Sequence, residues 1–200
     1  MQMNKSKIAF FGGTFDPIHL GHLFLLHQAT QFTPFESIIL SPVNINNFKL
    51  TKDSPATGED RLEMVKLAIL DYKELYPDDK ISLLVNGDDI ERGGVTYAYN
   101  SICNLIQKYT IQGKIGYLIG DDLLPTLHKW YKIEELLEKV DFYVFTREGY
   151  VPSLSFPIKL NLIPSLKYEQ SSTEIRTSLS LEGLSRRVKE YVKAHKLYQA

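Results

Sequence analysis

Residues 8–22 read IAFFGGTFDPIHLGH, and this stretch decides the fold. Its first four residues form an apolar run that is typical of a short buried strand. Gly12 and Gly13 then allow a tight turn and a close approach of the backbone to a ligand. Asp16 is a good N-cap and Pro17 a good first helical residue, so we expect a helix to begin there. The stretch therefore predicts a strand, a glycine turn and the N-terminus of a helix.

Two imidazoles lie near the start of that helix. His19 and His22 are three residues apart, so in a helix they share one face. Helix N-termini bind phosphate through free N–H groups and the helix dipole. Two histidines at such a site indicate chemistry on a phosphate rather than binding alone. The alternative, two surface or capping histidines beside an ordinary turn, must explain Gly21, because glycine costs about 1 kcal/mol relative to alanine inside a helix.

Strand-like and helix-like segments alternate along the whole chain. Strands are predicted at 7–11, 37–41, 81–86, 114–119, 142–146 and 158–163. Helices are predicted at 18–31, 59–72, 97–109, 133–139 and 184–197, with Thr57 as the N-cap of the second. This alternation predicts an α/β fold, a doubly wound parallel sheet with helices on both faces. Ligands bind at the carboxyl ends of the strands in such sheets, where the glycine turn also lies.

The bulk composition limits the class of protein. A length of 200 residues suits one domain over 1–200, with 171–200 as a C-terminal helical segment packed on it. A net charge of −1 argues against nucleic-acid binding, and the single cysteine, Cys103, excludes an internal disulfide. The apolar run before Gly12 is too short for a signal peptide, and no segment has the length of a transmembrane helix. We therefore expect a cytoplasmic protein with no nucleic-acid or membrane partner.

A second informative string, SSTEIR, occupies residues 171–176. Ser171 and Glu174 have capping-box spacing, which predicts another helix N-terminus. Three hydroxyls and a guanidinium gather there, from Ser171, Ser172, Thr173 and Arg176. Such a helix start suits a diphosphate or triphosphate. Taken alone, the string is equally consistent with a capped helix that carries an incidental arginine.

Both strings resemble motifs of the nucleotidylyltransferase superfamily. The first is similar to its GGTFDPxHxGH signature. The second is similar to its ISSTxIR motif, with Gln170 at the usual isoleucine or valine. Residues 120–122 (GDD) and Trp130 resemble the GxD…W element of bacterial nicotinate mononucleotide adenylyltransferases. An RxxM helix start at Arg61, a strand ending in Arg147, and the last helix closing with Tyr198 are similar to the same family. The resemblance covers nearly the whole chain and implies a Rossmann-like fold.

Departures from that family fall around the acceptor. The family's Pro-His-Lys loop reads Asn47-Phe48-Lys49 here, so the lysine is present and the histidine is absent. The usual Ser-Tyr-Thr reads Thr96-Tyr97-Ala98, and Glu148 stands at the proline of Arg-Pro-Gly. Nucleotidyl transfer is therefore more firmly indicated than the identity of the acceptor.

The resemblance implies adenylyl transfer from ATP to nicotinic acid mononucleotide, which yields nicotinic acid adenine dinucleotide and pyrophosphate in NAD biosynthesis. It assigns catalysis to His19, His22 and Arg176. It assigns ATP binding to Gly12, Gly13, Thr14, Phe15, His19, His22, Gly120, Asp122, Ser171, Ser172, Thr173 and Arg176. It assigns mononucleotide binding to Lys49, Thr96, Tyr97 and Trp130. We expect Mg²⁺ to bind mainly through the ATP phosphates and not at a dedicated protein site.

Several alternatives stay open at this point. Asp122 either accepts from ribose hydroxyls or caps the following helix, and Trp130 lies either in the site or in the core. Asp88, Asp89 and Glu91 suggest a metal site, but a polar loop at a strand end is the preferred interpretation. The rival functions are the same reaction on nicotinamide mononucleotide, transfer to phosphopantetheine or a small alcohol phosphate, and a non-catalytic adenine-nucleotide sensor. The sequence leaves homo-oligomerisation undecided.

Overall fold

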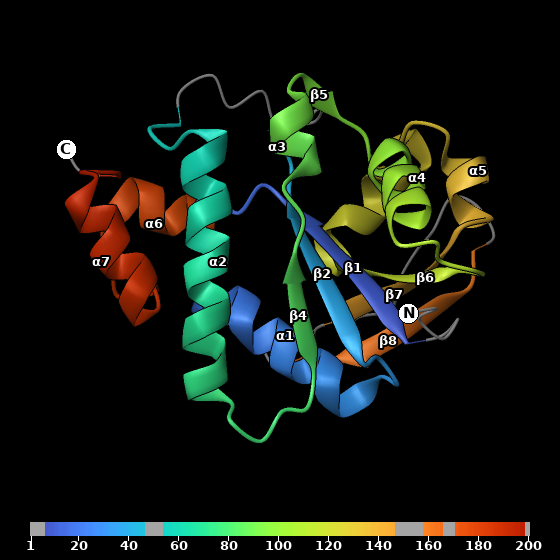
Figure 1. The fold of residues 1–200 in the computed structure, drawn as a ribbon, viewed down its shortest axis with the longest axis horizontal. Helices are drawn as coiled ribbons and strands as arrows, with labels where there is room; N and C mark the ends of the chain where they lie inside the picture. Colours follow the sequence, from blue (N-terminus) through green and yellow to red (C-terminus); the bar gives the residue numbers. More distant parts are fainter. Residues whose placement is uncertain (1–6, 47–53, 147–157, 166–170, 199–200) are drawn as a thin grey trace.

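Six parallel strands form the central sheet of the computed structural model, which describes residues 7–46, 54–146, 158–165 and 171–198 (Figure 1). They are β1 (Ile8–Gly13), β2 (Ser37–Pro42), β4 (Ser82–Val85), β6 (Ile115–Gly120), β7 (Val140–Thr146) and β8 (Leu160–Pro164). Each overlaps a predicted strand. Their order is β4-β2-β1-β6-β7-β8, with every neighbouring pair parallel. This is the 3-2-1-4-5-6 order of doubly wound nucleotide-binding folds, so the predicted fold class is confirmed.

Helices cover both faces of this sheet. One face packs against α1 (Leu20–Phe32) and α2 (Gly58–Leu75), with α7 (Arg186–Ala194) packed on the outside of α2 (Figure 1). The other face packs against α4 (Ala98–Lys108), the 3₁₀ helix η1 (Asp121–Lys129) and α5 (Ile133–Leu137). Along β1, Ala9 and Phe11 face the first layer while Ile8 and Phe10 face the second. This alternation follows from the period-2 geometry of a strand that is buried on both faces. The winding reverses between β1 and β6, and ligands bind outside the carboxyl ends at such a point.

Four elements are absent from the sequence prediction. Three are short, namely α3 (Asp88–Arg92) and the strands β3 (Ile45–Asn46) and β5 (Val95–Thr96), and the fourth is the nine-residue 3₁₀ helix η1. Strands β3 and β5 pair in parallel as a separate two-stranded sheet. The three short elements have two to five residues, too few to show a hydrophobic period, so the sequence does not reveal them.

Helix α2 begins as predicted. The Thr57 hydroxyl accepts from the Asp60 N–H at 3.1 Å, and the Asp60 carboxylate accepts from the Thr57 N–H at 2.9 Å. This reciprocal capping box satisfies two backbone donors that the helix itself leaves free. The predicted N-cap at Thr57 is confirmed.

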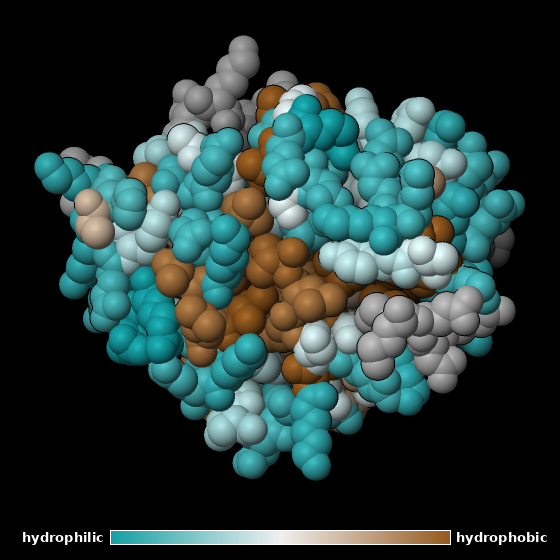
Figure 2. All heavy atoms as spheres, in the orientation of Figure 1, coloured by the Kyte–Doolittle hydropathy of each residue, from teal (hydrophilic) through white to brown (hydrophobic). Residues whose placement is uncertain are grey.

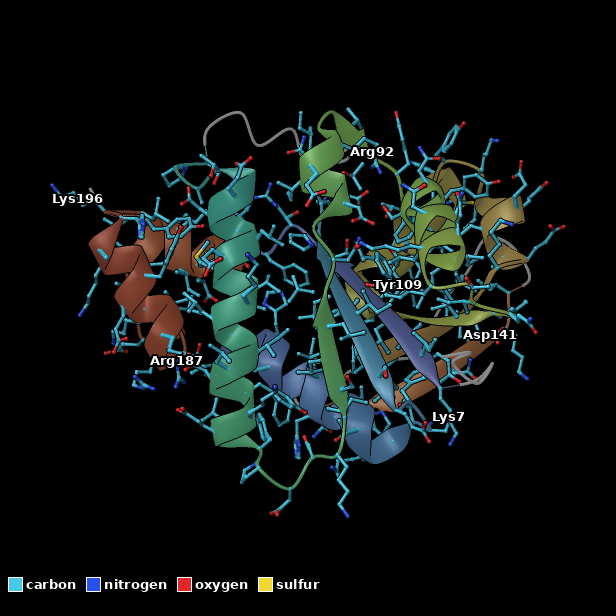
Figure 3. The ribbon with its side chains drawn as sticks, viewed as in Figure 1. Lys7, Arg92, Tyr109, Asp141, Arg187 and Lys196 are labelled. Atoms are coloured by element: carbon cyan, nitrogen blue, oxygen red, sulfur yellow. The ribbon has the colours of Figure 1, made fainter. Side chains whose placement is uncertain are left out.

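Helix α7 packs against α2, as Figure 1 shows. Val188 and Val192 are fully buried, and the helix is shorter than the predicted 184–197. The carboxylate of Asp71 on α2 accepts from the backbone N–H of Arg187 at 2.8 Å and from its guanidinium at 2.7 Å. Figure 3 labels Arg187 on α7, beside α2. A side chain of one helix thus fixes the start of the other.

The face that carries β4 and α2 has an apolar area at its centre (Figure 2). Strand β4 is an edge strand, and its Leu83 and Val85 are only partly buried, while Leu70 of α2 is 47% exposed. Within the ranges that the structure describes, no helix has both the length and the apolar composition needed to cross a bilayer.

Candidate active site

In the turn after β1, the residue with a positive φ is an aromatic one, Phe15. Gly12 and Gly13 lie inside the strand, and Phe15 is the residue with a left-handed φ, at 48°. A Cβ on Gly12 would come within 2.6 Å of the Phe10 ring, and one on Gly13 within 3.1 Å of the Phe15 ring. The predicted glycine turn is therefore wrong, since these glycines make room for aromatic rings. Burial of Phe15, whose ring lies 5.2 Å from that of His22, holds the strained backbone in place.

Helix α1 begins later than the sequence predicts. Its first residue is Leu20, and His19 is the N-cap in an extended conformation, with φ −141° and ψ 172°. Nδ1 of His22 accepts from the backbone N–H of His19 at 3.2 Å, which is the role that a glutamate takes in a capping box. The predictions of Asp16 as N-cap and Pro17 as first helical residue are wrong, because both lie in the turn before the helix.

The two imidazoles lie 3.9 Å apart between ring centroids. Burial lowers the pKa of His19 to about 4, against a smaller opposing effect of Glu174. The pKa of His22 lies well below its ordinary value, first because of burial and then because of the neighbouring His19. Both rings are therefore neutral at pH 7. Because Nδ1 of His22 is an acceptor, its proton lies on Nε2, which can donate to a ligand.

Asp16 is not a helix cap, because its buried carboxylate is instead contacted by residues from distant parts of the sequence. Its carboxylate is 2% exposed, and Oδ1 accepts from the hydroxyls of Ser54 at 2.8 Å and Tyr198 at 2.6 Å. Oδ2 has no hydrogen-bond partner among the described residues and lies 4.0 Å from the guanidinium of Arg176. Residues far apart in the sequence therefore meet at this one side chain.

Helix α6 (Ser172–Ser178) brings the second string to the first. Ser171 is its N-cap and forms the predicted capping box with Glu174. The Ser172 hydroxyl donates to the carbonyl of Pro17 at 3.0 Å. The guanidinium of Arg176 donates to the carbonyl of Asp16. The start of α6 and the turn before α1 are therefore in direct contact, although more than 150 residues separate them in the sequence.

Arg61, which the sequence marks only by its match to the RxxM helix start, bonds to three backbone carbonyls near the ends of β1 and β2. It is 5% exposed and donates to the carbonyls of Thr14 at 2.7 Å, Val43 at 2.6 Å and Asn44 at 2.9 Å. Burial lowers its pKa, and the charge of Asp16 opposes that shift. An arginine at the first turn of a helix gives no sequence signal for three long-range backbone contacts. The hydroxyl of Thr14 accepts from Asn46 at 3.3 Å.

Across the switch point, the end of β6 leads into η1. Gly120 is the N-cap of η1, so the alternative of Asp122 as the cap is wrong. A Cβ on Gly120 would collide with the Asp122 carboxylate, which lies against the bare glycine. The Trp130 indole packs on the rings of Tyr117 and Phe142, with centroids at 5.7 and 6.1 Å. Its Nε1 is buried without a hydrogen-bond partner among the described residues. The tryptophan therefore combines core packing with a free donor.

The predicted mononucleotide residues are only partly placed. The hydroxyl of Thr96, which is 5% exposed, accepts from the backbone N–H of Asn44, the residue before β3, at 3.0 Å. The ring of Tyr97 lies 4.8 Å from that of Tyr131. Lys49 lies outside the described residues. So do the other family departures and matches noted at Phe48, Arg147, Glu148 and Gln170.

Asp88, Asp89 and Glu91 lie in helix α3, so the preferred interpretation of a polar loop is wrong, and the two aspartates form ion pairs. Asp89 pairs with Arg92 at 2.6 Å and accepts from the Ser101 hydroxyl at 2.5 Å. Asp88 pairs with Lys108 at 2.7 Å. Within the described part of the chain, no group of three or more histidine, cysteine or acidic side chains is arranged to hold a metal ion.

Comparison with known proteins places this geometry in a family. The cytidylyltransferase-like family model matches residues 10–178. A probable nicotinate-nucleotide adenylyltransferase of Oceanobacillus iheyensis is 32% identical over 197 residues, which cover 96% of each chain. The nicotinate-nucleotide adenylyltransferase of Bacillus subtilis is 32% identical over 199 residues, covering 97% of this chain and 99% of the relative. This chain belongs to the nicotinate-nucleotide adenylyltransferases of the cytidylyltransferase-like family.

In this member of the nicotinate-nucleotide adenylyltransferases, residues 12–22 (GGTFDPIHLGH) and residues 171–176 (SSTEIR) both lie inside the matched residues 10–178. A solved structure of Plasmodium falciparum nicotinic acid mononucleotide adenylyltransferase complexed with NaAD superposes with a TM-score of 0.74. It covers 96% of this chain and 97% of its own, at 21% sequence identity. At that identity the likeness is one of fold.

Proposed function

We propose that this protein transfers the adenylyl group of ATP to nicotinic acid mononucleotide, and releases nicotinic acid adenine dinucleotide and pyrophosphate. The proposal depends mainly on one observation, the contact between the two stretches predicted to bind phosphate, residues 8–22 and 171–176. The turn that leads into the His19–His22 pair contacts the α6 helix that carries Arg176, beside the switch point of the sheet. The names of the relatives support the choice of substrates.

The reaction is an in-line displacement at the α-phosphorus of ATP. An oxygen of the mononucleotide 5′-phosphate forms the new P–O bond, and the bond to the bridging oxygen of pyrophosphate breaks. The attacking phosphate is already anionic at neutral pH, so it needs no strong general base. Catalysis then depends on positioning and on stabilising the charge of the transferring group.

The two histidines suit that second task. Neutral His22 would donate from Nε2, and His19 would donate from whichever ring nitrogen carries its proton. His19 Nδ1 is buried without a partner among the described residues, which leaves it available to a ligand. We assign both rings to the α-phosphate and the bridging oxygen, with His22 the more important.

The remaining ATP contacts come from three segments. We assign the β- and γ-phosphates to Ser171, Ser172, Thr173 and Arg176. Residues 12–15, which are Gly12, Gly13, Thr14 and Phe15, would line the phosphate path with their backbone. Asp122, which lies against Gly120 at the other side of the switch point, would accept from ribose hydroxyls.

The acceptor site is proposed at Thr96, Tyr97, Trp130 and Lys49. The buried and unpartnered Nε1 of Trp130 supports a ligand there, because a buried donor without an acceptor is unfavourable. Lys49 would add a positive charge for the incoming phosphate.

A divalent cation, for which we propose Mg²⁺, would accompany the triphosphate. The described residues offer no cluster of carboxylates to enclose it, and the Asp16 carboxylate already accepts two hydroxyls. These residues fit an ion held by phosphate oxygens and water, as the strongly hydrated Mg²⁺ prefers. When bound, the ion would neutralise part of the phosphate charge.

A pyrophosphate-release assay tests the proposal. The purified protein is given ATP and Mg²⁺ with nicotinic acid mononucleotide, nicotinamide mononucleotide or phosphopantetheine, and CTP with glycerol phosphate. We expect release with ATP and nicotinic acid mononucleotide and none without an acceptor. Binding of ATP with no release for any acceptor would overturn the proposal in favour of a nucleotide sensor.

A further inference from the structure

The C-terminal end of the described chain enters the site that the proposed function uses. Tyr198 is 3% exposed, and its hydroxyl donates to Oδ1 of Asp16 at 2.6 Å, across 182 sequence positions. Burial, and then the charge of Asp16, raises the pKa of Tyr198 far above its ordinary value. The hydroxyl therefore stays protonated and acts as a donor at any physiological pH.

The backbone directs Tyr198 inward. Helix α7 ends at Ala194, and the N–H of Leu197 then returns to the carbonyl of Val192 at 3.0 Å. Lys196 and Tyr198 both have a φ of 54°, in the left-handed region that non-glycine residues seldom adopt. Strained residues of this kind persist only where surrounding contacts hold them. For Tyr198 those contacts are its burial and its bond to Asp16.

Asp16 connects Tyr198 to the proposed ATP phosphate contacts. The same oxygen accepts from Ser54 at 2.8 Å, and Oδ2 lies 4.0 Å from the guanidinium of Arg176. Arg176 is held by the carbonyl of Asp16 and donates to the Thr173 hydroxyl at 3.3 Å. A buried carboxylate that loses a hydroxyl donor attracts the nearest cation more strongly. Here that cation is Arg176.

We propose that Tyr198 is a positioning residue, whose hydroxyl satisfies Asp16 and so leaves the Arg176 guanidinium free to hold the ATP phosphates. Without the hydroxyl, Arg176 would turn toward Oδ2 and away from the nucleotide. The inference rests on the proposed function, because it assigns Arg176 to ATP. The chain would in this way couple the docking of its C-terminal end to nucleotide affinity.

The test compares Tyr198→Phe with Tyr191→Phe. Tyr191 on α7 donates to a carboxylate of α2, Asp60, at 2.8 Å, so its variant loses a similar tyrosine–carboxylate bond but none that involves Asp16 or Arg176. We expect Tyr198→Phe to raise the KM for ATP and the Kd of a non-hydrolysable ATP analogue roughly tenfold. This corresponds to the loss of about one charge-assisted hydrogen bond between Arg176 and the phosphates. The KM for the mononucleotide should stay within about twofold, and Tyr191→Phe should leave both nucleotide constants unchanged. Equal losses for both nucleotides, or unchanged ATP affinity, would overturn the proposal.

A double variant separates positioning from general structural support. If Tyr198 acts through Arg176, then Arg176→Ala with Tyr198→Phe binds the ATP analogue no more weakly than Arg176→Ala alone. Additive losses would overturn the proposal. If Tyr198→Phe fails to fold, Ser54→Ala removes the other hydroxyl that donates to Oδ1 of Asp16, and it should also weaken binding of the ATP analogue. An unchanged affinity of Ser54→Ala for the analogue would overturn the proposal. The Kd of the analogue is measured by calorimetry, which requires no turnover. A wild-type protein that binds the analogue but shows no activity would refute the proposed function, and the comparison of Kd values between the variants would still test the role of Tyr198.

Discussion

Nδ1 of His22 accepts the backbone N–H of His19, and the two rings lie 3.9 Å apart between centroids. The His22 ring thus satisfies the backbone N–H of His19, the N-cap residue of α1. Because Nδ1 accepts this bond, the proton of the neutral His22 ring lies on Nε2. The pair is preorganised as neutral donors at the site where negative charge would develop. Such fixed donors contribute to catalysis because they need no reorganisation during the reaction.

Replacing His22 with alanine should lower kcat by at least about 100-fold, since one preorganised donor of this kind is worth that much. The variant also loses the acceptor for the His19 N–H, so unfolding should become easier by about 1 kcal/mol. Steady-state kinetics and thermal melts measure both. His128→Ala, at an exposed position of η1, is the control and should retain activity. Survival of His22→Ala activity within a few-fold would remove His22 from catalysis.

His19 should make stability depend on pH. Its pKa is about 4 in the folded protein and 6.5 when unfolded, so between these values the unfolded chain binds more protons. Stability is therefore lost as the pH falls through 6.5 toward 4. From pH 7.5 to 5.0 the loss is about 2 kcal/mol for this group, and His22 acts in the same direction. Urea unfolding at both pH values should show a smaller loss for His19→Gln than for the wild type. An identical loss would mean that His19 titrates normally.

The sequence identified the strands, the main helices and both informative strings, because these depend on local periodicity and capping chemistry. It misplaced the start of α1, because Asp16 is a favourable N-cap by local rules. In the fold, its carboxylate instead meets Ser54 and Tyr198, and its carbonyl meets Arg176. Contacts between residues distant in the sequence leave no mark on neighbouring positions. The contacts of Arg61 with three carbonyls, 17 to 47 residues away, were unpredictable for the same reason.

Arg176→Ala should raise the KM for ATP more than that for the mononucleotide, by roughly 10- to 100-fold, and should also lower kcat. The guanidinium is assigned to the leaving pyrophosphate, and a hydrogen bond to a charged group is worth about 1.5–3 kcal/mol. Arg176→Lys keeps the charge but not the planar fork, so its loss should be intermediate. Initial rates with each substrate varied in turn provide the measurement. An unchanged dependence on ATP would move the β- and γ-phosphate site elsewhere.

Arg61→Met should destabilise the fold by about 3 kcal/mol or more, because three buried carbonyls lose their donors together. Lys66→Ala on the same helix is the matched control, since Lys66 is half exposed and, among the described residues, its ion pair is with Glu63 at 3.0 Å. That change should cost less than about 0.5 kcal/mol. Denaturant unfolding compares the two variants. Similar midpoints for both would show that the three carbonyls are satisfied without Arg61.

The acid mononucleotide should be preferred over the amide. A carboxylate forms charge-assisted hydrogen bonds that a neutral amide cannot match, and a donor such as Trp130 Nε1 is penalised when it faces an amide N–H₂. Each such mismatch is worth roughly 1–3 kcal/mol, or about 5- to 150-fold in kcat/KM. Trp130→Phe keeps the packing on Tyr117 and Phe142 but removes the donor, so it should narrow that ratio while leaving the KM for ATP unchanged. Measuring kcat/KM for both mononucleotides at saturating ATP decides the matter. Equal values in the wild type, or a preference for the amide, would refute the acid assignment and leave adenylyl transfer intact.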